Sequence, residues 1–241
     1  MMALTFPHGA FNTPWEFAWA VLSIVLIDIV LAGDNAVVIA LAARSLPAEQ
    51  QRKAILFGSG AAVILRIALT VVAAKLLEVS YLQIVGGLLL LWIGAQLLGD
   101  DDGGSEDEPS VSTMGAAIRT ILIADLVMSL DNVIGVAAAA KGSTTLLILG
   151  LAISIPLVVF GSAMMIQLMT RFPIVVTFGA CLIGWVGGET IASDVALKEF
   201  ASANPWLHYT AATAGAALVL VIGKLLQKKA PHEESEPAKS E

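Results

Sequence analysis

The sequence predicts an all-α, polytopic membrane protein with seven transmembrane helices, in which an inverted repeat of three plus three helices precedes one C-terminal helix. Three observations lead to this prediction. The 241 residues are 57% hydrophobic and only 14% charged, and the mean hydropathy is +0.85, which is outside the range of soluble domains. Apolar runs of about 20 residues recur along the chain. An acidic motif inside one of these runs occurs again inside another.

Each predicted helix follows from an apolar run long enough to cross the hydrocarbon core of a bilayer. The runs predict helices at 17–43, 54–76, 81–98, 116–140, 144–169, 173–192 and 206–226. Trp15, Trp206 and Tyr81 lie near predicted helix ends, as aromatic residues do at membrane interfaces. No basic segment precedes the first run, which is also too long for a cleaved signal, so we expect it to be retained as the first span.

These runs divide the chain into five expected segments: an N-terminal segment with the first repeat (1–98), a flexible cytoplasmic loop (99–115), the second repeat (116–195), the seventh helix (196–227) and a disordered tail (228–241). The loop is rich in acids: Asp100, Asp101, Asp102, Glu106, Asp107 and Glu108. We interpret it as a solvated linker. The alternative is a funnel that attracts cations to the inner mouth.

The distribution of Lys and Arg predicts an outside N-terminus and a cytoplasmic C-terminus. With that orientation, nine basic residues lie inside: Arg44, Arg52, Lys53, Arg119, Arg171, Lys224, Lys228, Lys229 and Lys239. Three lie outside: Lys75, Lys141 and Lys198.

The repeated acidic motif is the main functional signal. It reads Asp28-Ile-Val-Leu-Ala-Gly-Asp34-Asn35, and 97 residues later Asp125-Leu-Val-Met-Ser-Leu-Asp131-Asn132. One carboxylate at mid-membrane costs about 2.5–3.5 kcal/mol on insertion scales. Four would cost on the order of 10 kcal/mol, comparable to the whole stability of many domains. We therefore expect these side chains to hold a cation.

Other residues repeat as well, with an offset of 93: Gly86, Trp92 and Gly94 match Gly179, Trp185 and Gly187. Each unit contains three helices, an odd number, so the second copy must enter the membrane from the opposite side. Inverted repeats of this kind are typical of transporters, which bind substrate near the midplane at the repeat interface.

The spacing within the motif limits how it can bind an ion. On a regular helix Asp28 and Asp34 are separated by about 120° around the axis and about 9 Å along it. Either the helix unwinds near residues 32–33, or the carboxylates form layers where the first and fourth helices cross. In the second arrangement, which we favour with a local distortion, Asp28 is level with Asp131 and Asp34 with Asp125. Symmetric unwinding is disfavoured, because a leucine replaces Gly33 in the second copy.

The expected ligands are mostly oxygen atoms, from the four carboxylates, the amides of Asn35 and Asn132, and the Ser129 hydroxyl. Such a set suits Mg²⁺, Ca²⁺ and Mn²⁺. The thioether of Met128 would favour Mn²⁺, although packing is the commoner role for such a residue. Carboxylates that share a low-dielectric site repel one another, which suggests proton release on metal entry and hence proton-coupled exchange.

Two more charged residues are accessory candidates. Arg66 lies within the second predicted span and is expected to pair with one of the aspartates, either as a fixed salt bridge or as one that breaks when metal arrives. Glu189 is expected either to face the transport cavity near its outer side or to reach water at the membrane interface. We expect Asp194 in a loop and the lone Cys181 in the core, where it acts as a small hydrophobe.

The two acidic motifs, together with the stretch from Trp185 through Glu189 to Asp194, resemble the TerC family of integral membrane proteins, over about residues 15–226. That family is named for tellurium resistance and grouped with LysE-type exporters. The resemblance implies a bacterial inner-membrane protein with manganese efflux as its activity, and some relatives supply manganese to enzymes outside the cell. The acidic positions of the family correspond to Asp28, Asp34, Asn35, Asp125, Asp131 and Asn132.

We therefore expect a secondary transporter that exports divalent metal, most plausibly Mn²⁺, and not an enzyme. The sequence contains no phosphate-binding loop of the kind that would indicate primary pumping. The duplicated motif fits an ion path better than the single aspartate dyad of an intramembrane aspartyl protease. The expected partners are the metal as substrate, the bilayer, and a second copy or another membrane protein. No resident cofactor or nucleic acid is expected. Two alternatives stay open: an exporter of organic cations or amino acids, and a non-transporting partner that supplies metal to other proteins.

Overall fold

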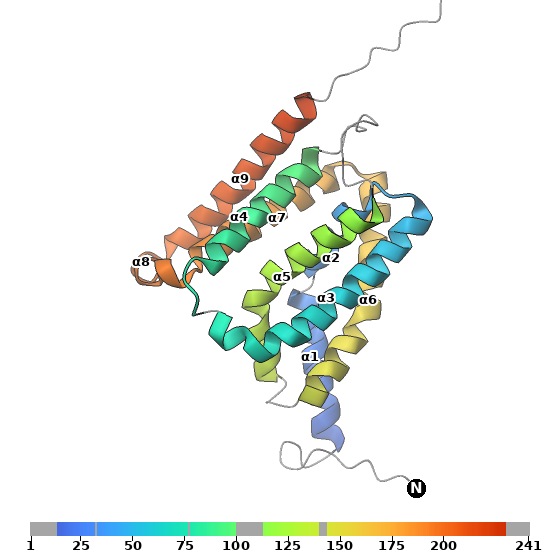
Figure 1. The fold of residues 1–241 in the computed structure, drawn as a ribbon, viewed down its shortest axis with the longest axis vertical. Helices are drawn as coiled ribbons and strands as arrows, with labels where there is room; N and C mark the ends of the chain where they lie inside the picture. The colour runs from blue at the N-terminus through green and yellow to red at the C-terminus, as the bar shows by residue number, and fades with distance from the viewer. Residues whose placement is uncertain (1–13, 32, 77, 100–112, 140–143, 230–241) are drawn as a thin grey trace, which may run out of the picture.

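The computed structural model describes residues 14–31, 33–76, 78–99, 113–139 and 144–229, and every regular element within them is helical. The elements are α1 (Pro14–Leu31), α2 (Gly33–Ala43), α3 (Ala48–Leu76), α4 (Leu82–Gly99), α5 (Met114–Ala139), α6 (Thr144–Arg171), α7 (Ile174–Ala192), η1 (Val195–Leu197), α8 (Lys198–Ala203) and α9 (Trp206–Lys229) (Figure 1). The all-α prediction is confirmed for this part of the chain. Most of the acidic loop and of the tail lies outside it.

In the described part, 5 helical stretches are long and apolar enough to cross a membrane: Ala48–Thr70, Leu82–Gly99, Ile148–Arg171, Ile174–Ala192 and Trp206–Gln227. Two shorter apolar stretches, Phe17–Leu26 and Asp34–Ala43, lie in α1 and α2. The prediction of a polytopic membrane protein is therefore confirmed, while the count of seven spans stays a prediction.

Local sequence explains several helix starts. The Thr113 hydroxyl accepts the backbone N–H of Ala116 at 3.3 Å and so caps α5. Prolines precede α3, α7 and α9, where the missing N–H costs nothing. The second predicted helix, expected from residue 54, begins at Ala48 because its polar first turns are helical too, with Lys53 paired to Glu49 at 2.7 Å.

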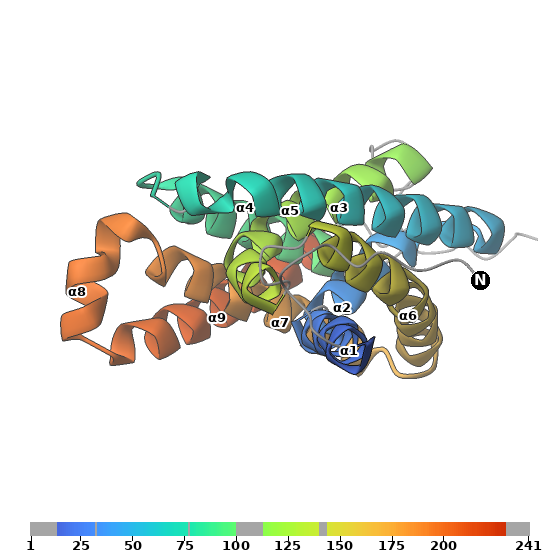
Figure 2. The same cartoon turned by 90° about the horizontal axis from the view of Figure 1, so that it is seen from below.

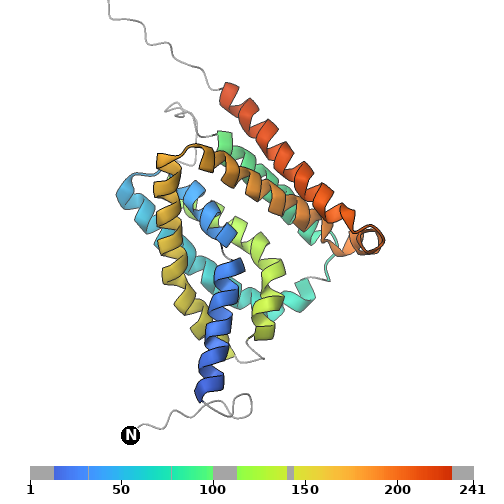
Figure 3. The same cartoon turned by 180° about the vertical axis from the view of Figure 1, so that it is seen from behind.

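The apolar run predicted as one helix over 17–43 is divided in the structure. α1 ends at Leu31, and α2 begins at Gly33 with a change of direction (Figure 3). The backbone N–H of Asn35 is bonded to the Asp34 carboxylate at 2.8 Å, which satisfies one of the N–H groups that the first turn of a helix leaves without an intrahelical acceptor. The second motif has no such division, because α5 continues from Met114 to Ala139. α5 nevertheless changes direction along its length as well (Figures 1 and 3).

Helices α4, α7 and α9 form a layer along one side of the molecule (Figures 1 and 3). Glycines allow their backbones to approach closely, as in other membrane helix interfaces. A Cβ added to Gly184 would lie 2.6 Å from the carbonyl oxygen of Gly215, and one added to Gly187 would lie 3.0 Å from that of Gly87. At one end of the layer, Gln227 donates to the carbonyl of Leu98 at 2.9 Å. Seen from below, α8 lies at the opposite end of the molecule from α6 (Figure 2).

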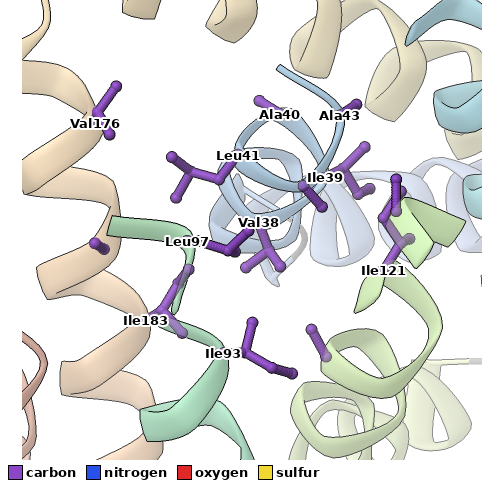
Figure 4. Close-up of a cluster of buried hydrophobic side chains, with 14 of the residues drawn as sticks. Val38, Ile39, Ala40, Leu41, Ala43, Ile93, Leu97, Ile121, Val176 and Ile183 are labelled. Atoms are coloured by element: carbon purple, nitrogen blue, oxygen red, sulfur yellow. The ribbon is translucent and has the colours of Figure 1, made fainter. Parts of the chain in front are cut away.

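The apolar core lies where this layer meets α2 and α5. Val38 and Leu41 of α2 pack with Ile93 of α4, Ile183 of α7 and Ile121 of α5 (Figure 4). This packing positions α2 beside α5, and α3 runs along the other side of α5 (Figure 1). The helices α2, α3 and α5, which carry most of the residues predicted to form the cation site, are thereby brought together.

Candidate cation site

Four polar side chains from three helices form a buried cluster: Asn35 of α2, Arg66 of α3, and Asp125 and Ser129 of α5. Their exposed fractions are 3%, 4%, 5% and 0%. Burying a charge or an amide in an apolar interior is costly unless it is paired. Hydrogen bonds between the four side chains provide most of the partners that these buried groups need.

The ion pair between Arg66 and Asp125 is the centre of the cluster. The guanidinium donates to Asp125 Oδ1 at 2.6 Å. Its Nε donates to the Ser129 hydroxyl at 2.9 Å, and that hydroxyl donates to Asp125 Oδ2 at 3.1 Å. Asp125 and Ser129 are four residues apart on α5 and so share a face. The guanidinium is thus held by two partners through two of its nitrogens, which a lysine ammonium would not reproduce.

The first motif contributes Asp34 and Asn35 from the beginning of α2. Asn35 Nδ2 donates to Asp125 Oδ1 at 3.3 Å. Its other amide atom, Oδ1, is buried and has no hydrogen-bond partner within the described structure. Asp34 is half-buried and accepts the Asn35 backbone N–H. The two motifs therefore meet through Asn35 and Asp125, while the layer of Asp34 with Asp125 stays a prediction.

The other motif residues are only partly described. Asp28 lies in α1 and Asp131 in α5, but their side chains lie outside the described part of the structure. The predicted layer of these two acids stays a prediction. Asn132 is half-buried, three residues after Ser129 on α5.

Two accessory candidates do not join the cluster. Met128 is 4% exposed and packs in the apolar core with α2 and α4 side chains, which supports packing as its role. Glu189 is exposed on α7, and no contact within the described residues joins it to the cluster.

Sequence reasoning missed the role of Asp194, which was expected in a loop. This side chain is 0% exposed and accepts four backbone N–H groups. Its Oδ1 accepts from Tyr81 at 2.9 Å and Ala196 at 2.8 Å, and its Oδ2 from Gln83 at 3.0 Å and Ile84 at 3.2 Å. Burial alone would raise the pKa of Asp194, but the four N–H groups together lower it below its ordinary value. The carboxylate caps η1 and the beginning of α4 together, so it joins the end of the second predicted repeat to the first.

The one sequence signal for this contact was an aspartate followed by a short helical segment, the pattern of an N-cap. Tyr81 adopts a left-handed backbone conformation with φ of 70°, which is uncommon for a residue other than glycine. Its N–H is bonded to Asp194, so the contact helps hold this turn.

Chemically, the cluster offers oxygen ligands and one fixed positive charge. Within the described residues, no group of three or more His, Cys, Asp or Glu side chains is placed to hold a metal. The described acceptors nearest to such a role are the Asp34 and Asp125 carboxylates and the unpartnered Asn35 Oδ1.

Comparison with known proteins identifies relatives among bacterial membrane proteins. The chain is 43% identical over 185 residues to the uncharacterized membrane protein YjbE of Bacillus subtilis, covering 77% of this chain and 84% of that protein. It is 25% identical over 205 residues to YkoY of the same organism, covering 77% of this chain and 63% of that one. The UPF0053 inner membrane protein YgdQ of Escherichia coli is 28% identical over 135 residues, which cover 48% of this chain and 57% of YgdQ.

No solved structure matches this chain significantly. Residues 13–231 match the family described as the Integral membrane protein TerC family. The match covers both acidic motifs and every helix from α1 to α9. The chain therefore belongs to the TerC family of integral membrane proteins.

Proposed function

We propose that this protein is a secondary transporter that exports a divalent metal ion, Mn²⁺ in preference to others, by alternating access. The observation that carries the proposal is the meeting of the two acidic motifs, in which Asn35 of the first lies 3.3 Å from Asp125 of the second. Ionisable side chains within a membrane protein mark ion pathways by default, and the buried Asn35 Oδ1 has no partner within the described structure.

The chemistry of the cluster supports a hard or borderline divalent cation. The ligands available are carboxylate, amide and hydroxyl oxygens, which suit Mg²⁺, Ca²⁺ and Mn²⁺. Since Met128 packs in the apolar core, no thioether supports Mn²⁺ over the other two. The choice of Mn²⁺, the direction of export and the inner-membrane location with an outside N-terminus rest on the family resemblance and on the distribution of basic residues.

Helix contacts support the inverted repeat. If α4 corresponds to α7 and α5 to the first motif's helices, the contact of α4 with α5 should recur between α7 and α2. A Cβ added to Gly86 of α4 would lie 2.8 Å from Val127 of α5, and one added to Gly179 of α7 would lie 2.7 Å from Val37 of α2. Gly86 and Gly179 are the glycines that match at the offset of 93. The correspondence supports the repeat at the level of whole helices, since Val127 and Val37 occupy different positions in the two motifs.

The test is Mn²⁺ flux into proteoliposomes, comparing the native chain with Asp34→Asn and Asp131→Asn, with and without a pH gradient. We expect saturable flux that either substitution abolishes, and flux that depends on the gradient if protons are exchanged. A well-folded native protein that carries no Mn²⁺ would contradict the proposal. Flux that ignores the pH gradient would contradict proton coupling alone.

An exporter of organic cations is the second candidate, and one observation favours it. Asp125 and Ser129 already hold a guanidinium group, that of Arg66, in good geometry. Thermal protection by arginine or lysine, with none by Mn²⁺, would support this candidate over metal export. Saturable Mn²⁺ binding without flux, together with a co-purifying protein, would instead support a metal-supplying partner.

A further inference from the structure

We propose that Arg66 is the counter-cation of the empty transporter: its guanidinium neutralises Asp125 when no cargo is bound and leaves Asp125 when the cargo cation arrives. This inference rests on the proposed transport function and specifies how the same site is emptied and refilled.

The geometry makes Arg66 and a cargo cation competitors for the same carboxylate. Both oxygens of Asp125 are engaged, Oδ1 by Arg66 at 2.6 Å and by Asn35 at 3.3 Å, and Oδ2 by Ser129 at 3.1 Å. A metal ion that binds Asp125 needs at least one of these oxygens. On Oδ1 it replaces the guanidinium directly. On Oδ2 it displaces the Ser129 hydroxyl, which also accepts from Arg66 Nε, so on either oxygen the cargo competes with a contact that holds Arg66.

Burial explains why an empty transporter needs this cation. The side chains of Arg66 and Asp125 are 5% and 6% exposed. An ionised carboxylate without a partner is very costly in such surroundings. Arginine does not lose its proton in proteins, so Arg66 supplies a permanent charge that does not depend on pH. The pair lets the protein change conformation with no cargo while Asp125 stays neutralised.

The neighbouring residues provide a place where the cargo can bind first. Asp34 is half-buried, and Asn35 presents an unpartnered Oδ1 within a buried side chain. The amide of Asn35 also contacts Asp125 through Nδ2. A cation held by Asp34 and Asn35 therefore lies next to Asp125, where it weakens the hold of that carboxylate on Arg66.

A fixed structural clamp between α3 and α5 is the competing explanation, and it makes different predictions. A clamp stabilises the fold whether or not cargo is present, so its loss should weaken metal binding and every mode of transport alike. A displaceable counter-cation opposes cargo binding, so its loss should strengthen binding. It should also impair only the step in which the empty protein returns.

The experiment compares the native chain with Arg66→Gln, Arg66→Lys and the control Arg52→Gln, which removes an exposed arginine from the same helix. Mn²⁺ affinity is measured by isothermal titration at pH 8. Net Mn²⁺ flux into metal-free liposomes is compared with exchange of labelled Mn²⁺ between two Mn²⁺-containing compartments, because exchange does not require the empty protein to return.

For Arg66→Gln we expect Mn²⁺ to bind about tenfold more tightly, equivalent to ~1.4 kcal/mol, with net flux reduced about tenfold and exchange largely retained. Arg66→Lys keeps the charge but not the two-nitrogen geometry, so its Mn²⁺ affinity should lie between those of the native chain and Arg66→Gln. Arg52→Gln should match the native chain.

Weaker or unchanged Mn²⁺ affinity in Arg66→Gln, or equal losses of net flux and exchange in a folded variant, would overturn the counter-cation role while leaving transport itself intact. If Arg66→Gln does not fold, Arg66→Lys decides: tighter Mn²⁺ binding than in the native chain supports the inference, and weaker binding in a folded protein contradicts it. Absence of flux in the native chain would instead count against the proposed function.

Discussion

Replacing Asp194 by asparagine should destabilise the protein markedly, although the two side chains have nearly the same size. The carboxylate accepts two backbone N–H groups on each oxygen: Tyr81 and Ala196 on Oδ1, and Gln83 and Ile84 on Oδ2. An asparagine has one oxygen, and its NH₂ group must face the other pair of donors in either orientation. Two backbone N–H groups therefore lose their acceptor.

The structure allows the size of this effect to be estimated. Each buried donor left unpaired costs about 1–3 kcal/mol, so Asp194→Asn should lower the free energy of unfolding by about 2–6 kcal/mol. For a chain of this length each kcal/mol lowers Tm by roughly 2–4 °C, which gives a decrease of at least about 4 °C.

The assay is thermal unfolding of the detergent-solubilised protein, followed by intrinsic tryptophan fluorescence. The matched control is Ser193→Ala, because Ser193 is the exposed neighbour and its hydroxyl donates to the Glu189 carbonyl of the same helix end. A Tm for Asp194→Asn within about 1 °C of the native and control values would refute the claim that this carboxylate joins η1 to α4.

Three further predictions follow from the same structure. The pKa of Asp194 is lowered from its ordinary value of 3.8, so the stability that this carboxylate contributes is full above that pH and is lost as the pH falls below it. The Tm difference between the native protein and Asp194→Asn should therefore shrink below about pH 4. A Tm difference that grows there would contradict this direction. Gly184→Ala should lower the free energy of unfolding by about 1–3 kcal/mol, since its Cβ would lie 2.6 Å from the Gly215 carbonyl oxygen. The control Gly60→Ala, whose Cβ meets nothing within 4 Å, should not destabilise the protein. Equal Tm values for the two variants would count against close packing of α7 and α9. Ser129→Ala should cost about 1 kcal/mol in the same assay because Arg66 Nε loses its acceptor, and an unchanged Tm would argue against that bond.

Most helix positions could be predicted because apolar run length largely determines a membrane helix. The run expected at 81–98 became α4 (Leu82–Gly99), and the run expected at 173–192 became α7 (Ile174–Ala192). The division between α1 and α2 was predicted only as a local distortion, since hydropathy does not change across it. The short helix α8 was missed because it is neither long nor apolar.

The candidate site was predictable in composition but not in pairing. The sequence predicted a layer of Asp34 with Asp125, and the contact that the structure describes joins the neighbouring Asn35 to Asp125. Which aspartate would receive Arg66 could not be predicted, because that choice depends on how α3 packs along α5. Asp194 was missed for the same reason: three of its four partners lie 110 to 113 positions away in the sequence.

The most direct test of the central claim is to measure how much Mn²⁺ the solubilised protein binds at equilibrium, comparing the native chain with Asp34→Asn and the Ser193→Ala control. Asp34 is the informative position, because it lies beside the cluster and no ion pair within the described structure depends on it. We predict saturable binding in the native and control proteins and loss of that binding in Asp34→Asn. Equal Mn²⁺ binding by all three folded proteins would contradict the claim that the joined acidic motifs hold the transported cation.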